Sequence, residues 1–416
     1  MTKIIITGLN LTNENFEYSM QEFTNLAQAA EMDVCQQLTQ AADHPNAGTY
    51  LGSGKVVELA TAIQANQAEA LLVNAQLSPT QLRNIESLVK VPVIDRTELI
   101  LEIFSRRAQT KRAQLQVEIA RLKYQLPRLR VSGFNKLDQQ SSGGQGANRG
   151  AGETQHELTK RILQKRITQL THQLQELATE QTTQSRARKR SGLPLVALVG
   201  YTNAGKSTTF NGLLKLFGEK TAHQVLVKDQ LFATLDTSIR RLTFPDQKSL
   251  LLSDTVGFIS QLPADLLEAF KTTLETVLEA DLLVQVVDCS HPEHEKMIAA
   301  TNETLHEIGA DTIPMIYAYN QADKLEIAYP VIEGQQITYS AIDSKSLKML
   351  ADLLKQQLFK GYQKLDYLIP YTAGRYVEEL NQQAHVLNTS YTEEGTLLHA
   401  EVSPVQAQKY ARFQKH

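Results

Sequence analysis

The stretch LVALVGYTNAGKST, residues 195–208, decides the fold of the central part of this chain. An apolar run typical of a buried strand leads directly into the pattern G-x-x-x-x-G-K-S, and a helical pattern follows. Glycines let the backbone turn tightly, so that its N–H groups and the helix N-terminus point at phosphate oxygens. The sequence therefore predicts a nucleotide-binding loop made of Gly200, Tyr201, Thr202, Asn203, Ala204, Gly205, Lys206, Ser207 and Thr208.

Four residues in and after this loop have the chemistry needed to hold a triphosphate and Mg²⁺. Lys206 is predicted to place its positive charge on the β- and γ-phosphates, and Ser207 is the predicted hydroxyl ligand of Mg²⁺. The apolar strand KSLLLSDTVGF follows, and Asp254 at its end is predicted to reach Mg²⁺ through water. Gly257 is predicted to touch the γ-phosphate through its N–H. The D-x-x-G pattern alone is a weak indication of a nucleotide site. Its place at the end of a strand that follows the phosphate loop makes the indication strong.

The segment LFATLDTSIRRLTF, residues 231–244, lies between these two motifs. Thr234 is the preferred hydroxyl to close on Mg²⁺ only when a γ-phosphate is present, because it lies in the stretch expected to move and precedes a convincing strand. Thr221 and Thr237 remain alternatives. Phe232 is assigned to the same nucleotide-binding set.

The choice of base is predicted from Asn320-Gln-Ala-Asp323, which follows the strand PMIYAYN. A carboxylate that accepts from both N1–H and the N2 amine of guanine rejects adenine, so Asp323 selects GTP and GDP. Gln321 replaces the Lys of the usual N-K-x-D pattern, which puts nucleotide affinity in doubt more than base identity. Ser340 and Ala341 are predicted to contact guanine O6 through a backbone N–H.

Two positions bear on mechanism. Phe258 stands where Ras-like switches carry a water-positioning Gln, so no catalytic side chain is assigned with certainty. Hydrolysis is expected to be slow unless a partner organises the attacking water. Asn203 stands where cation-activated GTPases hold K⁺, which makes K⁺ a candidate second cofactor; the alternative is a loop Asn bonded to its own backbone.

A chain of 416 residues is long enough for several domains, and the hydrophobic periodicity predicts an α/β protein in four parts. Thr97 to Leu126 reads as one unbroken amphipathic helix, and a second helix is expected from about Glu153 to Gln181. The two helices should form a long antiparallel hairpin joined by a Gly-rich loop. The predicted parts are an N-terminal α/β domain (1–105), the basic hairpin with its loop and linker (106–190), a doubly wound, mostly parallel G domain (191–361) and a small α+β domain (362–416).

The elements expected inside the terminal domains follow from shorter patterns. Strands are predicted at 3–9, 69–75 and 91–96, alternating with helices, which indicates a mostly parallel sheet. In the last domain we expect a helix near 374–383, a hairpin turning at Glu393-Glu394-Gly395, and a final helix after Pro404.

Charge is unevenly distributed along the chain. The formal net charge is −3, but residues 106–190 hold 18 Lys and Arg against 6 Asp and Glu, a net of +12, which leaves −15 for the remainder. This asymmetry predicts a nucleic-acid partner, the alternative being a solvated helix pair without one. Candidate RNA contacts are Arg149, Lys160 and Arg161.

Composition excludes other classes. Cys35 and Cys289 are too few for a disulfide framework, no export signal begins the chain, and no run of about 18 apolar residues occurs. We expect a cytoplasmic, monomeric protein without a membrane span. Gly52-Ser53-Gly54-Lys55 looks like a second phosphate loop but has Thr49 where a glycine is required. It predicts either an anion-binding helix start or a helix start that needs tight packing.

The chain resembles the HflX-type GTPases over nearly its whole length. The resemblance rests on YLGSGKVVEL (50–59), GGQGANRGAGETQHEL (143–158), VGYTNAGKST (199–208), FATLDTS and SDTVGFI. It implies GTP hydrolysis, binding to the large ribosomal subunit and its rRNA, and splitting of stalled or idle ribosomes under stress such as heat. Some members also bind ATP through the N-terminal domain. The alternative is a GTP-dependent RNA-binding or ribosome-assembly module with little or no hydrolysis, motivated by Phe258 and Gln321.

Overall fold

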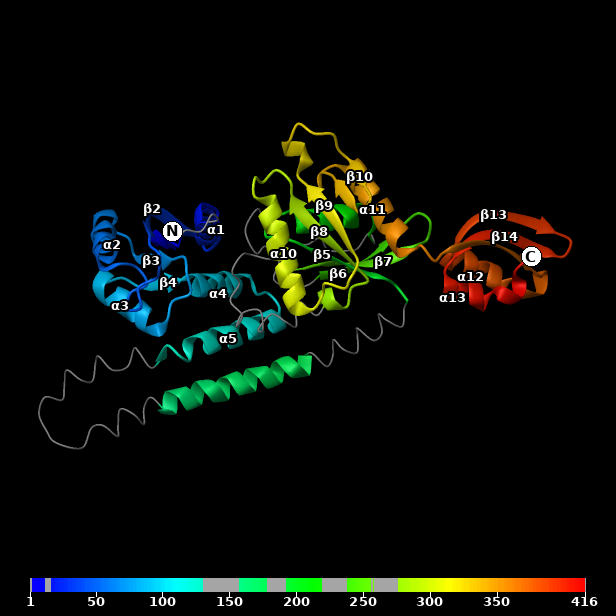
Figure 1. The fold of residues 1–416 in the computed structure, drawn as a ribbon. Coiled ribbons are helices and arrows are strands. Elements are labelled where there is room, and N and C mark those ends of the chain that lie inside the picture. The colour runs from blue at the N-terminus through cyan, green and yellow to red at the C-terminus, as the bar shows by residue number, and fades with distance from the viewer. Residues whose placement is uncertain are drawn as a thin grey trace, which may run out of the picture. The chain divides into compact units, whose positions relative to one another are not determined.

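The computed structural model describes residues 2–11, 16–129, 157–177, 192–218, 238–255, 257 and 276–415 (Figure 1). The chain divides into two compact units. Unit 1 comprises Met1–Ala187, Lys228–Asp236 and Val256–Leu274, and unit 2 comprises Arg188–Val227, Thr237–Thr255 and Glu275–His416. Within the described ranges, no helix combines the length and apolar character needed to cross a membrane.

Unit 1 is built on a parallel sheet with strand order β2-β1-β3-β4. Ile4 and Ile6 of β1 pack in one apolar cluster, whereas Ile5 packs in another, so both faces of the sheet are buried. A sheet covered on both faces needs nearly continuous apolar strands, which β1 and β3 supply. The elements are β1 (Thr2–Asn10), α1 (Phe16–Ala29), β2 (Met32–Ala41), α2 (Ser53–Asn66), β3 (Ala70–Val73), α3 (Pro79–Val89), β4 (Val93–Asp95) and α4 (Arg96–Arg107).

The prediction of a single helix from Thr97 to Leu126 is wrong. Helix α4 ends at Arg107, and a separate helix, α5, runs over Lys111–Gln125. Ala108 takes an extended conformation, and the Thr110 side chain accepts a hydrogen bond from Ala113 N to begin α5. The apolar stripe continues across the interruption, so periodicity alone does not reveal it. The hydrogen bond accepted by the Thr110 side chain starts a new helix at this point, in competition with a continuous helix.

The second arm of the predicted hairpin is present as a helix over residues 157–177 (Figure 1). Leu170 of this helix is buried against Leu115 and Ile119 of α5. Arg166 forms an ion pair with Glu118 of α5 at 3.0 Å. The predicted ends of this helix and the Gly-rich segment lie outside the described residues.

The G domain in unit 2 has seven described strands in the order β10-β11-β9-β8-β5-β7-β6. Strands β5, β7, β8, β9 and β11 are parallel, while β6 and β10 are antiparallel at the two edges, as the predicted mostly parallel sheet requires. Carboxyl ends of parallel strands meet at one edge, which is where ligands bind in such sheets. The elements are β5 (Leu195–Val199), α8 (Lys206–Phe217), β6 (Ser238–Thr243), β7 (Ser249–Asp254), β8 (Leu282–Asp288), α10 (His294–Ile308), β9 (Met315–Asn320), η1 (Ala322–Lys324), β10 (Val331–Glu333), β11 (Gln336–Thr338) and α11 (Ser344–Leu358).

The C-terminal lobe of unit 2 is a small antiparallel sheet of order β12-β14-β13 with short helices. The predicted hairpin and both predicted helices are present, and the last helix begins with a capping box formed by Ser403 and Gln406. Strand β12 had not been predicted. The elements are β12 (Gln363–Ile369), η2 (Tyr371–Ala373), α12 (Arg375–Gln383), β13 (His385–Thr392), β14 (Gly395–Val402), α13 (Pro404–Lys409) and η3 (Ala411–Phe413).

Candidate nucleotide-binding site

The loop between β5 and α8 has the backbone of a phosphate cradle. Gly200 and Gly205 have φ angles of +135° and +94°, which side-chain-bearing residues rarely adopt. A Cβ at Gly200 would overlap the backbone oxygen of Val286, and one at Gly205 would overlap the side-chain amide of Asn320. Both glycines are therefore required by space as well as by conformation.

Lys206 lies inside this loop. Its Nζ donates to the carbonyl oxygens of Gly200 at 2.9 Å and Tyr201 at 2.6 Å. The side chain is buried, and burial lowers the pKa of Lys206 to about 8, against the opposing effect of the Asp254 carboxylate. The ammonium thus lies where a bound phosphate would compete with the loop carbonyls for it.

Ser207 in the first turn of α8 and Asp254 at the end of β7 are two of the three residues predicted to hold Mg²⁺, and they lie side by side. Ser207 Oγ donates to Asp254 Oδ2 at 2.7 Å, and Asp254 is fully buried. Thr255 Oγ1 next to it donates to the Leu198 carbonyl at 2.6 Å, which ties the end of β7 to β5. A buried carboxylate beside a hydroxyl is a donor set that suits a hard cation such as Mg²⁺.

Asn320 joins the phosphate loop to the base-binding side. Its Nδ2 donates to the Ala204 carbonyl at 2.9 Å, and its Oδ1 accepts from Ala341 N at 2.9 Å. The side chain is 2% exposed, so both bonds are shielded from water. The Asn320 amide therefore joins three predicted parts of the site, namely the phosphate loop, the N-x-x-D motif and the Ser340-Ala341 loop.

The predicted base-reading carboxylate lies close to the loop that contains Ser340 and Ala341. Asp323 is exposed on η1, and Ser340 Oγ donates to its Oδ1 at 2.6 Å. Gln321 has a left-handed backbone, and its Nε2 donates to the Asn203 carbonyl at 3.2 Å. The residue that replaces the usual Lys therefore ties the base motif to the phosphate loop. Asn203 is exposed with φ of 63°, and its K⁺ role stays a prediction.

The remaining predicted residues fall into a group that the structure does not describe and a group that it does. Phe232, Thr234 and Phe258, with the alternatives Thr221 and Thr237, lie outside the described residues. Gly257 is described as half-buried after the end of β7. The remaining loop residues, Thr202 and Thr208, are respectively buried and half-buried in the cradle.

Sequence reasoning missed two supports behind the loop. Thr209 Oγ1 donates to the Gly205 carbonyl at 2.9 Å and lies 2.6 Å from the hydroxyl of buried Tyr339. The Cys289 thiol donates to the Asn320 carbonyl at 2.9 Å, and burial, followed by the charge of Asp288, raises the pKa of Cys289 to about 11. Thr209 directly follows the motif and could have been suspected from its position, but nothing marks Tyr339 or Cys289.

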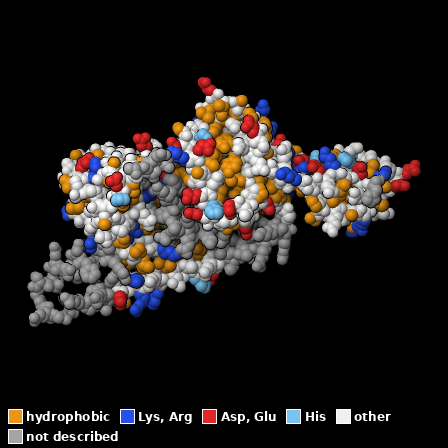
Figure 2. Space-filling view, viewed as in Figure 1, with side chains coloured by type: hydrophobic (Ala, Val, Ile, Leu, Met, Phe, Trp, Pro, Cys, Tyr) orange, Lys and Arg blue, Asp and Glu red, His pale blue; other side chains and the backbone are white. Residues whose placement is uncertain are grey.

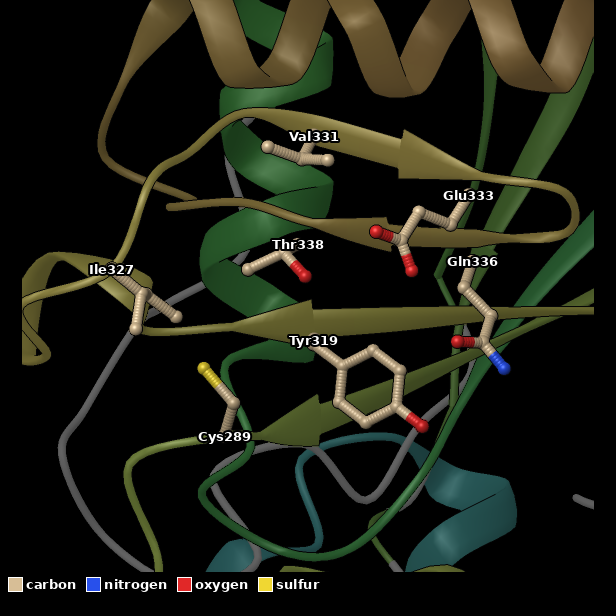
Figure 3. A pocket seen from close by; sticks show the side chains of 7 residues that line it. All are labelled: Cys289, Tyr319, Ile327, Val331, Glu333, Gln336 and Thr338. Carbon is tan, nitrogen blue, oxygen red and sulfur yellow. The ribbon is translucent and has the colours of Figure 1, made fainter.

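A cavity of about 220 Å³ opens beside this region on the sheet formed by β9, β11 and β10 (Figure 3). No lining residue belongs to the predicted nucleotide set, so the cavity is distinct from the phosphate cradle. It is lined by Cys289, Tyr319, Ile327, Val331, Glu333, Gln336 and Thr338.

The other candidate sites lie in unit 1. On helix 157–177, Arg161 is exposed and Lys160 is half-buried, while Arg149 lies outside the described residues. Gly52 N donates to Gln40 Oε1 at 2.9 Å, and a Cβ at Gly52 would crowd that amide. Lys55 pairs with Glu58 at 2.8 Å. These contacts favour the packing interpretation of the Gly52 segment.

The phosphate loop with its buried lysine, the Ser207–Asp254 pair and the N-x-x-D motif meet at the carboxyl edge of a mostly parallel sheet. Together they define a P-loop GTPase. Family models agree along the chain: "GTP-binding GTPase N-terminal" matches residues 17–105, "GTP-binding GTPase Middle Region" matches 107–188, and "50S ribosome-binding GTPase" matches 195–321.

Whole-chain relatives identify the family. GTPase HflX of Caldanaerobacter subterraneus is 40% identical over 93% of this chain and 88% of its own length. GTPase HflX of Escherichia coli is 40% identical over 80% of this chain and 76% of its own. A solved GTP-binding protein from Sulfolobus solfataricus in complex with GDP is 25% identical, covering 86% of this chain and 98% of that one at a TM-score of 0.44. The chain belongs to the GTPase HflX family and hydrolyses GTP.

Proposed function

We propose that this protein binds the large ribosomal subunit when loaded with GTP and splits stalled or idle ribosomes under stress such as heat. Hydrolysis to GDP and phosphate then releases it. The observation that carries the proposal is a pair of packed, basic helices on the same chain as the nucleotide site. The family model described as "50S ribosome-binding GTPase", which matches residues 195–321, supports the same partner. We further propose four domains with the predicted boundaries, and a cytoplasmic monomer.

The proposed nucleotide chemistry uses residues that lie together in unit 2, and adds Thr234, which lies outside the described residues. Lys206 would exchange its two carbonyl partners for phosphate oxygens, and Asp323 would accept from the guanine edge. Ser207 and Asp254 would hold Mg²⁺ together with Thr234. The ion would neutralise charge on the phosphates.

The helix pair carries cations that suit RNA phosphates. Figure 2 shows one face of the molecule, on which Lys and Arg side chains are scattered among hydrophobic and acidic ones. Glu118 is already paired with Arg166, so it offsets little of the remaining positive charge. Counterion release from phosphates would make such binding strong at low salt and weak at high salt. Besides Arg166, the exposed cations of the two helices are Lys111, Arg121, Lys123, Arg161 and Lys165.

Co-sedimentation with large subunits tests the binding step. Wild type should pellet with a non-hydrolysable GTP analogue and stay in solution with GDP, and a variant without residues 141–152 tests the Gly-rich loop. Equal pelleting in both nucleotides would contradict the switch.

Light scattering of intact ribosomes tests the splitting step. Addition of protein with GTP should lower the scattering, whereas protein with GDP should leave it unchanged. GTP turnover measured with and without large subunits then separates a ribosome-activated GTPase from an assembly module that hydrolyses little GTP. Unchanged scattering would remove the splitting activity from the proposal.

A further inference from the structure

Two guanidinium groups converge on one phenol in the C-terminal lobe. Arg375, the first residue of α12, donates from Nη2 to the Tyr376 hydroxyl at 2.7 Å, and its Cζ lies 4.6 Å from the Tyr376 ring centroid. Arg412 of η3 hydrogen-bonds the same tyrosine, and its Cζ lies 4.8 Å from the same centroid. Both hydrogen bonds favour the ionised phenol and lower the pKa of Tyr376.

Neither of these two positive charges forms an ion pair within residues 276–415, all of which are described. Arg375 does act on the nearby Glu379 carboxylate, whose pKa is lowered first by the hydrogen bond from Lys409 and to a smaller extent by the charge of Arg375. Glu379 of α12 is engaged by Lys409 at 2.8 Å and by the Tyr410 hydroxyl at 2.9 Å. Both arginines are exposed. Two like charges held at one phenol repel each other, and an anion bound between them would relieve that repulsion.

Aromatic rings hold the two guanidinium groups in place. The Tyr376 ring lies 5.2 Å from the Phe413 ring and 6.2 Å from the Tyr410 ring. The Arg412 guanidinium also lies 4.6 Å from the Phe413 ring centroid. Stacking on rings that are themselves packed reduces the freedom that the arginines would lose on binding a ligand.

We propose that Arg375 and Arg412 form a binding site for a phosphate of the RNA backbone. A guanidinium fork matches phosphate oxygens bidentately, and exposed cations beside aromatic rings are typical of RNA-binding surfaces. The ring of Tyr371, four residues before Arg375, is 59% exposed and is available for stacking on a base. The source of the RNA rests on the proposed function, because the large subunit would present it.

A charge-reversed double variant tests the site in the full-length protein. Arg375→Glu with Arg412→Glu is compared with Lys345→Glu and Lys348→Glu, two exposed cations of α11 that give the same change in net charge. Dissociation constants are measured at several salt concentrations, with a non-hydrolysable GTP analogue, for large subunits and for protein-free large-subunit rRNA. GDP affinity and the unfolding midpoint establish that each variant is folded.

We expect the arginine variant to bind both RNA targets about tenfold more weakly, with the slope of log Kd against log salt reduced by about 1. The control variant Lys345→Glu with Lys348→Glu should bind as tightly as wild type. The affinity of Arg375→Lys with Arg412→Lys should fall between those of wild type and the charge-reversed arginine variant. Weaker binding to subunits but not to naked rRNA would mean a protein partner and overturn the proposal. The proposal would also be overturned if the charge-reversed arginine variant and the Lys345→Glu, Lys348→Glu control lost equal affinity. Wild-type affinity of the charge-reversed arginine variant would overturn it as well.

The same measurements separate this site from the proposed function. Wild type that binds naked rRNA through these arginines but ignores large subunits would leave the site standing and remove the ribosomal role. Wild type that binds large subunits in the GTP state, with no effect of either arginine substitution, would do the reverse. If the charge-reversed variant fails to fold, the lysine-for-arginine pair decides alone, because it keeps the charge while removing both forks.

Discussion

Among single residues, Asn320 has the largest structural role in the nucleotide site. Replacement by Ala removes the bonds to the Ala204 carbonyl and the Ala341 N–H, and leaves both groups buried without their partner. Each orphaned group costs about 1–3 kcal/mol, so GDP affinity should fall by roughly tenfold or more. Asn320→Asp keeps the acceptor for Ala341 N but loses the donor to Ala204.

Equilibrium titration with a fluorescent GDP analogue checks this prediction. Asn320→Asp should bind no better than Asn320→Ala, because a buried carboxylate oxygen would face the Ala204 carbonyl oxygen with no proton between them. Wild-type affinity in Asn320→Ala would mean that the loops hold their geometry without the amide.

Lys206 makes nucleotide binding dependent on pH. In the free site burial lowers its pKa to about 8, whereas bound phosphates would raise it. The free protein therefore loses the proton as the pH passes about 8, and binding must then restore it. Affinity should be highest below that pH and fall above it, with Kd for GDP rising roughly tenfold from about pH 7 to about pH 9.

Calorimetry in buffers of different ionisation enthalpy measures this proton uptake directly. Lys206→Gln removes the titrating group, so any pH dependence that it retains belongs to the nucleotide or to other groups. A wild-type profile parallel to that of Lys206→Gln would show that Lys206 does not titrate in this range.

Sequence patterns predict which residues form the site but not which contacts join them. The motifs supplied Lys206, Ser207, Asp254 and Asp323, because each motif requires fixed residue types at short spacing. The contact between Gln321 and Asn203 and that between Thr209 and Tyr339 join segments far apart in sequence. Such contacts depend on strand order, which a single motif does not encode.

At the scale of elements, the packing of helix 157–177 against α5 depends on few side chains. Leu170 is 1% exposed in the cluster with Leu115 and Ile119, whereas Ile162 on the same helix is 64% exposed. Leu170→Ala should destabilise the helix pair by about 2–4 kcal/mol. Ile162→Ala, the matched control, should cost less than about 0.5 kcal/mol.

Hydrogen exchange of the amides in α5 and in helix 157–177 measures the effect locally. GDP affinity should not change in either variant, since the nucleotide site lies in unit 2. Equal exchange rates for the Leu170 and Ile162 variants would mean that these helices do not depend on one another.

Two features that the sequence patterns did not predict have separate physical causes. Strand β2 has the sequence MDVCQQLTQA and lies at a sheet edge, where few apolar residues are needed and the strand pattern is weak. The break between α4 and α5 rests on one threonine cap within a continuous apolar stripe. In contrast, β5 and β7 are buried along nearly their whole length, and their apolar runs made them predictable.

In the whole molecule, the nucleotide bound in unit 2 is proposed to control whether the chain binds its partner. The substitution Asp323→Asn should change which base this site prefers, so that the nucleotide of this protein can be varied independently of GTP. An Asn amide can donate to the O2 that xanthine carries in place of the N2 amine of guanine, so the variant should prefer xanthine nucleotides. Ser340 still provides a partner for the side chain at this position.

The most direct measurement is binding to large ribosomal subunits with non-hydrolysable analogues of GTP and of xanthosine triphosphate. Wild type should bind subunits only with the guanine analogue, and Asp323→Asn should bind them only with the xanthine analogue. Subunit binding by both proteins regardless of the nucleotide would contradict the claim that this site, read through Asp323, is the switch.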